Sequence, residues 1–195
     1  MDFPGVAMIT GAGSGIGRET AILFAKEGCE TIAITDISEK GLAETKGLIE
    51  SITNDASIKS YVCDVSDESA VQKMVDDIVE NFGRLDYCAN VAGIILLGVQ
   101  TAKMETSFFD KHHNINLRGL FFCERAQLQQ MLKQEPLPTK DSKRAFRGSI
   151  VNVSSMAGLT GNGAIPAYTA SKHGVIGLSK AVRTFSQVLS GHSSC

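Results

Sequence analysis

Tyr168 and Lys172 stand four residues apart in the segment Tyr168-Thr-Ala-Ser-Lys172. If this segment is helical, their side chains lie one turn apart on the same face. A phenol can give or take a proton, and a neighbouring ammonium favours its phenolate form. Of the three tyrosines, only Tyr168 has a lysine four residues later, because Tyr61 and Tyr87 are followed at that spacing by valine. The pair therefore predicts acid–base chemistry.

Two serines, Ser154 and Ser155, directly follow a predicted strand over residues 149–153 (SIVNV). Ligands of open α/β sheets bind at the carboxyl ends of the strands, so a hydroxyl here could hold a substrate oxygen. A serine after a strand can also cap the next turn, a structural role that suits Ser154 better.

A glycine-rich segment, Thr10–Gly17 (TGAGSGIG), follows a predicted strand and opens a predicted helix. Glycines permit a tight turn and let the backbone approach a pyrophosphate, and the helix N-terminus supplies N–H donors. An ordinary glycine-rich turn is the structural alternative. The spacing is T-G-x-x-x-G-x-G rather than G-x-G-x-x-G, because Ile16 stands where the third glycine of the latter pattern would be.

Asp36 ends the second predicted strand, 19 residues after Gly17. A carboxylate here can accept hydrogen bonds from the adenosine ribose hydroxyls and repels a 2′-phosphate. Neither the glycine loop nor the Ile37-Ser38 pair contains a lysine or arginine for that phosphate. NAD(H) is therefore favoured over NADP(H), which stays the alternative. An acid near a helix N-terminus is the structural alternative for Asp36.

Short β-rich runs alternate with helical patterns along the chain. The clearest predicted helix spans residues 67–82, with Ser66 as its N-cap. The predicted helix 38–52 has an apolar side formed by Leu42, Leu48, Ile49 and Ile52. Five βα units predict an α/β, Rossmann-type doubly wound parallel sheet in a three-layer α/β/α arrangement, one domain over residues 1–195. The predicted strands are 6–10, 31–35, 59–63, 85–89 and 149–153, and the predicted helices are 16–27, 38–52, 67–82, 107–133 and 166–189.

Composition narrows the function class. Nineteen Lys and Arg against 21 Asp and Glu give a net charge of −2, which offers no case for nucleic acid or an anionic membrane. The longest apolar stretch, Val91–Val99, is too short to span a bilayer, and no secretory signal is visible, so we expect a cytoplasmic protein. The five cysteines, without a C-x-x-C pair, predict reduced and mostly buried thiols.

The histidines indicate no metal site. His112 and His113 are adjacent and are interpreted as ordinary helix residues, and none of the four histidines has metal-ligand spacing with cysteine or carboxylate residues. The segment 135–147, with two prolines and six charges, predicts an exposed loop.

Together the motifs resemble those of the short-chain dehydrogenase/reductase family, in the family's order from Thr10 to Lys172. The loop is similar to the family's cofactor loop, whereas the extended epimerase type would need glycine in place of Ser14. The other resemblances are Asp64-Val65 to an adenine-contacting D-V pair, Asn90-Val91-Ala92-Gly93 to N-N-A-G with Val91 as a departure, and Asn114–Leu117 to N-x-N-L.

The resemblance implies interconversion of a secondary alcohol and a ketone by hydride transfer, with Tyr168 as acid/base. Ser155, 13 residues before Tyr168, would position the substrate oxygen. Lys172 would support the tyrosine and bind the nicotinamide ribose, and Asn116 would support a water in the proton relay. The implied cofactor-binding residues are Gly11, Ser14, Gly15, Ile16, Gly17, Asp36, Asp64, Val65, Asn90, Ala92, Gly93, Tyr168 and Lys172.

Family members continue beyond the helix that carries Tyr168, with two more strands and a lid. Here only a polar tail follows the predicted helix 166–189, so we expect a sheet that lacks the last strands of the usual family sheet. A catalytically silent form that binds cofactor or pairs with a full-length subunit is therefore the alternative to an enzyme. The resemblance also implies a homo-oligomer packed through helices 107–133 and 166–189. The segment Ile94–Val99 hints at an apolar alcohol or ketone, with core packing as the stronger alternative.

Overall fold

The computed structural model describes residues 3–53, 56–98, 100–137 and 146–189, with side chains as far as Arg183. The chain divides into two compact units. Unit 1 comprises residues 1–92 and 122–151, and unit 2 comprises residues 93–121 and 152–195. The prediction of one domain over the whole chain stays a prediction.

Unit 1 is built on a five-stranded sheet with the order β3-β2-β1-β4-β5. Strand β1 pairs in parallel with β2 on one side and with β4 on the other, and β2 pairs in parallel with β3. The strand order reverses between β1 and β4, which confirms the doubly wound topology and places its switch point there. The strands are β1 (Val6–Thr10), β2 (Thr31–Asp36), β3 (Ser57–Val62), β4 (Tyr87–Asn90) and β5 (Ser149–Asn152).

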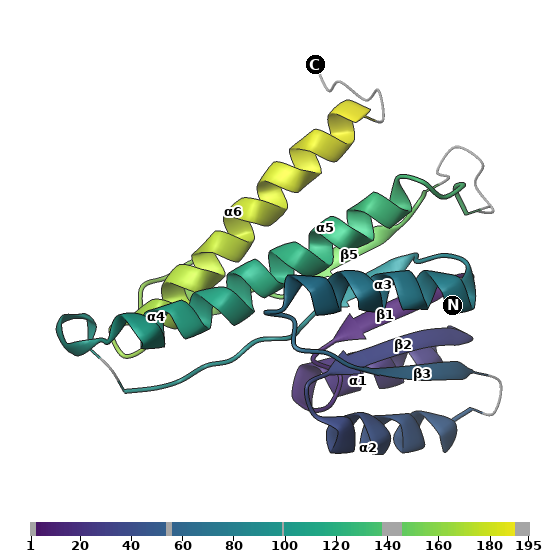
Figure 1. Ribbon diagram of the computed structural model, residues 1–195, viewed down its shortest axis with the longest axis horizontal. Coiled ribbons are helices and arrows are strands. Elements are labelled where there is room, and N and C mark those ends of the chain that lie inside the picture. The colour runs from purple at the N-terminus through teal and green to yellow at the C-terminus, as the bar shows by residue number, and fades with distance from the viewer. Residues whose placement is uncertain (1–2, 54–55, 99, 138–145, 190–195) are drawn as a thin grey trace. The chain divides into compact units, whose positions relative to one another are not determined.

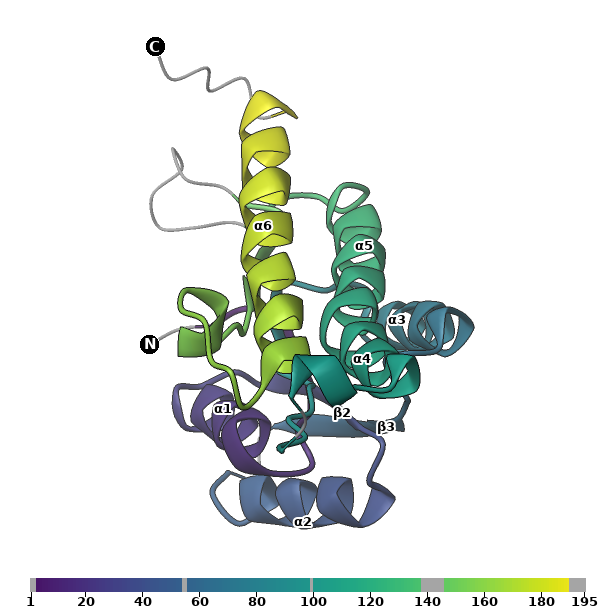
Figure 2. The same cartoon turned by 90° about the vertical axis from the view of Figure 1, so that its left-hand side faces the viewer.

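Helices cover both faces of this sheet (Figures 1 and 2). Helices α1 (Gly15–Lys26) and α2 (Glu39–Glu50) lie on one face, where Ile32 and Ile34 of β2 join the apolar core. Helix α3 (Glu68–Phe82) lies on the other face with residues 122–131 of α5 (Leu120–Met131). Successive residues of β2 point to opposite faces of the sheet. Thr35 therefore points to the face opposite that of Ile34, where its hydroxyl donates to the sulfur of Met74 on α3.

Two expectations about these helices are wrong. Asp67 rather than Ser66 is the N-cap of α3, because its carboxylate accepts the backbone N–H groups of Ser69 and Ala70. On α2, Leu48 and Ile52 are 44% and 43% exposed. The buried stripe of that helix runs instead through Leu42, Thr45 and Ile49, at helical spacing.

Unit 2 contains the helical segments η1 (Thr101–Lys103), α4 (Thr106–His113), η2 (Asn114–Gly119), η4 (Met156–Gly158) and α6 (Pro166–Leu189). The single predicted helix 107–133 is therefore interrupted by η2, which is a π-helical segment. Helix α6 packs closely on η2, since a Cβ atom added to Gly174 would lie 2.7 Å from Leu117 Cδ2. The absence of a side chain at Gly174 thus permits the contact.

The predicted loop 135–147 is only partly exposed where the structure describes it. Leu137 is 5% exposed, and its N–H donates to the carbonyl of Phe146 at 2.9 Å. This isolated bridge ties the two ends of the loop together, and residues 138–145 lie outside the described residues.

Asp86 is a fully buried carboxylate just before β4. It accepts the backbone N–H of Val6 at 2.9 Å and a bidentate pair of bonds from Arg84 at 2.8 Å. The side-chain amide of Gln134 donates to it as well. Asp86 therefore joins the start of β1 to the start of β4.

We expect Asp86→Ala to lower the free energy of unfolding by about 3–5 kcal/mol, because Arg84 and the Val6 N–H lose their buried partner. Urea unfolding followed by circular dichroism measures this loss. Asp76→Ala, on the exposed face of α3, is the control and should cost less than about 0.5 kcal/mol. Equal losses for the two variants would show that Asp86 has no special structural role.

Four cysteines of unit 1, Cys29, Cys63, Cys88 and Cys123, are buried and free. Their burial was predicted, and Cys195 lies outside the described residues. Burial raises the pKa of all four thiols, to about 11 for Cys63 and about 12 for Cys123. The folded state therefore keeps these thiols protonated at a pH where the unfolded chain has begun to lose the protons.

Alkaline pH should consequently destabilise the fold. Above pH 9 the unfolded chain binds fewer protons, so the free energy of unfolding falls by up to about 1.4 kcal/mol per pH unit for each such thiol. This contribution is fully present below the unfolded pKa and is lost as pH rises toward the folded value of about 11 for Cys63. Urea unfolding at pH 8, 9 and 10 with a reductant should give a shallower decline for Cys63→Ala than for the wild type. Parallel declines would contradict this assignment.

Candidate active site

The glycine loop lies against the end of β4, at the switch point of the sheet. The Thr10 hydroxyl accepts the backbone N–H groups of Val91 at 3.0 Å and of Ala92 at 3.1 Å. Gly11 has a φ of +70°, and a Cβ atom there would lie 2.8 Å from the Ala92 nitrogen. Thr10 and Gly11 thus hold the β1 and β4 loops in direct backbone contact.

The second half of the loop forms an open cradle at the start of α1. A Cβ atom at Gly17 would lie 2.1 Å from the Gly11 carbonyl oxygen, so only glycine lets α1 begin this close to the strand. Gly15 has a φ of +50° and open space around it, Ser14 is exposed at the N-cap, and Ile16 is 67% exposed. An exposed helix N-terminus behind a bare backbone turn fits the pyrophosphate of a dinucleotide.

Asp36 is fixed beside this loop by two backbone groups. Its Oδ2 atom accepts the N–H of Gly13, and its Oδ1 atom accepts the N–H of Ser38, both at 2.9 Å. The carboxylate is half-buried, with lone pairs remaining for the hydroxyls of a ribose. Its position at the carboxyl end of β2 is the one that the sequence predicts.

The remaining predicted cofactor residues of unit 1 lie along the same edge of the sheet. Asp64 is exposed after β3 and accepts bonds from the Ser66 N–H and hydroxyl, whereas Val65 is buried. Asn90 is 2% exposed, and its amide exchanges two hydrogen bonds of 2.9 Å with the amide of Gln127. The side chain of Asn90 is therefore occupied within unit 1.

In unit 2, the π-helical segment η2 turns Asn116 inward. Its Oδ1 accepts the Ile94 N–H at 2.8 Å, and its Nδ2 donates to the Ile94 carbonyl at 2.9 Å and to the Ser171 hydroxyl at 3.1 Å. Asn116 is fully buried, so these bonds fix the segment after Gly93. A Cβ atom at Gly93 would lie 3.1 Å from the Asn116 Oδ1.

Lys172 is a buried ionisable side chain of α6. Only 4% of it is exposed, and its Nζ donates to the Val153 carbonyl at 2.8 Å. Burial lowers the pKa of Lys172. The same nitrogen lies 5.7 Å from the ring centroid of the half-buried Tyr168, one turn away on α6. The predicted pairing of these two side chains on one helix face is confirmed.

The capping role that was expected to suit Ser154 falls to Ser155. Ser155, not Ser154, is the N-cap of η4, and its hydroxyl oxygen accepts the Ala157 N–H at 3.1 Å. The Ser154 hydroxyl instead donates to the Lys172 carbonyl at 2.9 Å. Because capping uses only the oxygen of Ser155, its hydroxyl proton stays available to a ligand.

His112 makes structural contacts that the sequence did not indicate. It is fully buried, its Nε2 accepts the Leu96 N–H at 3.2 Å, and its Nδ1 lies 2.9 Å from the Phe108 carbonyl. His112 is a helix residue of α4, as expected, and its bond to Leu96 also anchors the segment 94–97. Within that segment Ile95 and Leu97 are 51% and 71% exposed, so core packing does not explain them.

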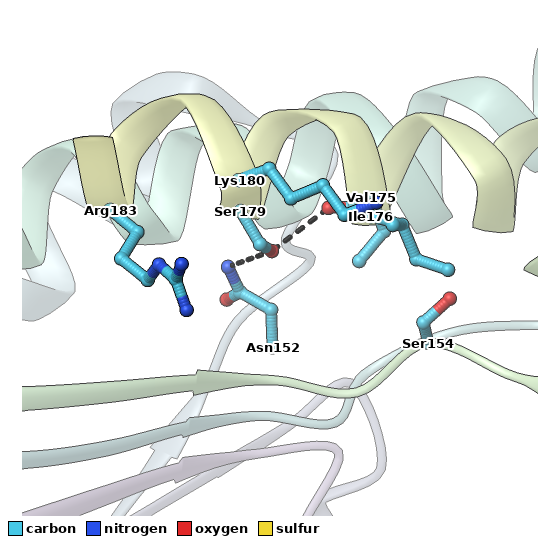
Figure 3. A pocket seen from close by; sticks show the side chains of 7 residues that line it. All are labelled: Asn152, Ser154, Val175, Ile176, Ser179, Lys180 and Arg183. Atoms are coloured by element: carbon cyan, nitrogen blue, oxygen red, sulfur yellow. Dashed lines mark hydrogen bonds between the residues drawn. The ribbon is translucent and has the colours of Figure 1, made fainter. Parts of the chain in front are cut away.

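A separate pocket of about 550 Å³ opens beside α6 in unit 2 (Figure 3). The Asn152 amide donates to the Ser179 hydroxyl at 3.0 Å, and Ser179 donates to the Val175 carbonyl at 2.8 Å. No predicted catalytic side chain lines this pocket. Its lining residues are Asn152, Ser154, Val175, Ile176, Ser179, Lys180 and Arg183.

A parallel sheet of this order, with a glycine loop at its switch point, defines a Rossmann-type fold. The profile of the short chain dehydrogenase family matches residues 5–187. The protein therefore belongs to the short-chain dehydrogenase family. Across the described residues, no helix is long and apolar enough to cross a membrane.

Relatives of known structure share the fold. The chain is 38% identical to the levodione reductase of Leifsonia aquatica over 90% of its own length and 61% of that enzyme. An NAD⁺-bound xylitol dehydrogenase matches with a TM-score of 0.79 and 32% identity, over 91% of this chain and 63% of that one. An actinorhodin polyketide ketoreductase with NADPH gives the same four values. The chain thus spans less than two thirds of the length of these three proteins.

The Thr10 hydroxyl gives the site a direct test. We expect Thr10→Val to lower the free energy of unfolding by about 1–3 kcal/mol, because two N–H groups at the end of β4 lose their acceptor. Thr10→Ser keeps the oxygen and should recover most of the loss. Thermal and urea unfolding measure both variants, and equal stabilities for the valine and serine variants would show that the two bonds do not matter.

Proposed function

We propose that the protein is an NAD(P)-dependent oxidoreductase that interconverts a secondary alcohol and a ketone, with Tyr168 as acid/base. The observation that carries this proposal is the buried Lys172 ammonium 5.7 Å from the Tyr168 ring. A buried charge beside a phenol is costly as mere structure and useful for proton transfer. A bound nicotinamide supplies the hydride donor or acceptor.

The roles proposed for Ser155, Lys172 and Asn116 in unit 2 are based on their hydrogen bonds. The Ser155 hydroxyl has a proton to donate to a substrate oxygen, while its own oxygen is held by the Ala157 N–H. Lys172 is kept in place by the Val153 carbonyl and has further protons for Tyr168 and a ribose hydroxyl. Asn116 is proposed to act in the proton relay through the segment that it holds, since its amide bonds Ile94 and Ser171.

In unit 1, the cradle from Gly11 to Gly17 is proposed to hold the pyrophosphate, and Asp36 the adenosine ribose. Asp64, Val65, Asn90 and Ala92 are proposed as the other cofactor-binding residues of this unit, mainly through backbone groups in the case of Asn90. Gly93, the first residue of unit 2, is proposed as a further one. The Asp36 carboxylate favours NAD(H), because it accepts ribose hydroxyls and repels a 2′-phosphate. The exposed Ile95 and Leu97 support an apolar substrate. The cytoplasmic location of the protein and its assembly into a homo-oligomer both stay predictions.

Tyr168→Phe is the decisive variant. We expect it to reduce ketone-dependent oxidation of NADH by at least about 10²-fold, the contribution of a positioned acid. The affinity for NADH, measured by its fluorescence, should stay within about twofold, because the variant changes one hydroxyl and no backbone group.

Tyr61→Phe is the matched control. The Tyr61 hydroxyl on β3 is buried without a hydrogen-bond partner, so its removal should leave turnover unchanged. Undiminished turnover in Tyr168→Phe would overturn the assigned role. NADH binding without turnover in the wild type would instead favour the catalytically silent form, and a medium-chain apolar ketone series tests this over a range of substrates.

A further inference from the structure

The backbone of Gly13 forms hydrogen bonds with two side chains of opposite charge, Asp36 and Arg18. Its N–H donates to the Asp36 carboxylate at 2.9 Å, and its carbonyl accepts a bond from the Arg18 guanidinium. Arg18 lies on α1, directly after the glycine loop, and is therefore neither within the loop nor next to Asp36 in the sequence. Gly13 therefore lies between the Arg18 cation and the Asp36 carboxylate that is proposed to hold the ribose.

Helix α2 holds this guanidinium in place. The Arg18 Nη2 lies 2.9 Å from Glu44 Oε2, and its Nε donates to the Thr45 hydroxyl at 3.0 Å. Thr45 is fully buried and donates in turn to the carbonyl of Ala12 in the glycine loop. Because a Cβ atom at Gly41 would lie 2.6 Å from the Gly13 oxygen, α2 touches the loop directly.

Four charged side chains are connected in this region, directly at Gly13 or through Glu44. Asp36 and Glu44 are the carboxylates, and Arg18 and Lys40 are the cations, with Lys40 Nζ 4.0 Å from Glu44 Oε1. A 2′-phosphate carries a charge of about −1.5 to −2 near neutral pH. It would meet two carboxylates here, one of which already occupies the guanidinium that suits a phosphate best.

We propose that Glu44 is a positioning residue that sets cofactor specificity together with Asp36. Glu44 engages Arg18, so the discrimination against NADP(H) depends on two carboxylates rather than on Asp36 alone. With both neutralised, Arg18 and Lys40 form a phosphate site beside Gly13. This inference rests on the proposed function, since it requires the adenosine ribose to lie at Asp36.

The test is a double-mutant cycle of Asp36→Asn and Glu44→Gln, with NADH and NADPH affinities measured by fluorescence titration at low salt. Each substitution removes a charge and keeps the shape of the side chain. Glu44→Gln alone should change little, because Asp36 still repels the phosphate. The double variant should bind NADPH about tenfold more tightly than the product of the single effects predicts.

Glu50→Gln is the matched control, because Glu50 forms a comparable pair with Lys46 at 3.7 Å on the same helix and away from the glycine loop. It should not couple to Asp36→Asn. Adding Arg18→Met to the double variant should cancel the gain in NADPH affinity. Should that protein fold poorly, the salt dependence provides a second measurement, since NADPH binding to the double variant must weaken more steeply with salt than binding to Asp36→Asn.

Two results would overturn the inference and leave the proposed function standing: additive effects in the cycle, or equal coupling for Glu50→Gln, with NADH bound by the wild type. Failure of the wild type to bind NADH or NADPH would overturn the proposed function and the inference together. Unchanged melting temperatures for the single variants would show that the affinities report on the site rather than on stability.

Discussion

Direct contact between backbones at the switch point of the sheet is the constraint on which unit 1 depends. A Cβ atom at Gly17 would lie only 2.1 Å from the Gly11 carbonyl oxygen, and Gly11 itself lies against Ala92. Any side chain at these positions would separate α1 from β1 or the β1 loop from the β4 loop. The Thr10 hydroxyl then joins the two loops by accepting two N–H groups. An open, rigid cradle at the start of α1 is the consequence.

In unit 2 the arrangement depends on a buried cation, Lys172, as unit 1 depends on its backbone contacts. Lys172 is held by the Val153 carbonyl and lies beside Tyr168, so Val153 and the start of α6, both in unit 2, are fixed to each other. Asn116 and His112 hold the segment 94–97 from the other helical stretch of the unit. Asn116 and His112 are fully buried with both polar ends of their side chains hydrogen-bonded, which makes the arrangement specific as well as stable.

The family profile and the solved relatives agree with the fold, while the relatives' names span levodione, xylitol and a polyketide. This spread is expected when one scaffold carries variable substrate loops. The cofactors in the relatives' titles also differ, NAD⁺ in one and NADPH in another. For this chain, the charges around Gly13 are the basis that we propose for discrimination between the two cofactors.

Much of the fold could be predicted because periodicity is local. The order of strands and helices, the glycine loop, Asp36 and the pairing of Tyr168 with Lys172 all follow from spacing within a single element or turn. The errors arose where a polar residue took a core position or a nearby residue capped better, as with Thr45 on α2 and with Asp67 and Ser155 at helix starts.

The sequence by itself determined the type of sheet, the cradle and the pairing of Tyr168 with Lys172, because glycine spacing and helical periodicity act over a few neighbouring residues. The roles proposed for the other site residues rest on the family resemblance. Only the tertiary structure decided which groups meet across elements. It brought Arg18 and Glu44 to either end of one ion pair beside Gly13, turned His112 inward to hold Leu96, and occupied Asn90 with Gln127. Such contacts join residues 16 to 37 positions apart, and a pattern read along the chain contains no distance between them.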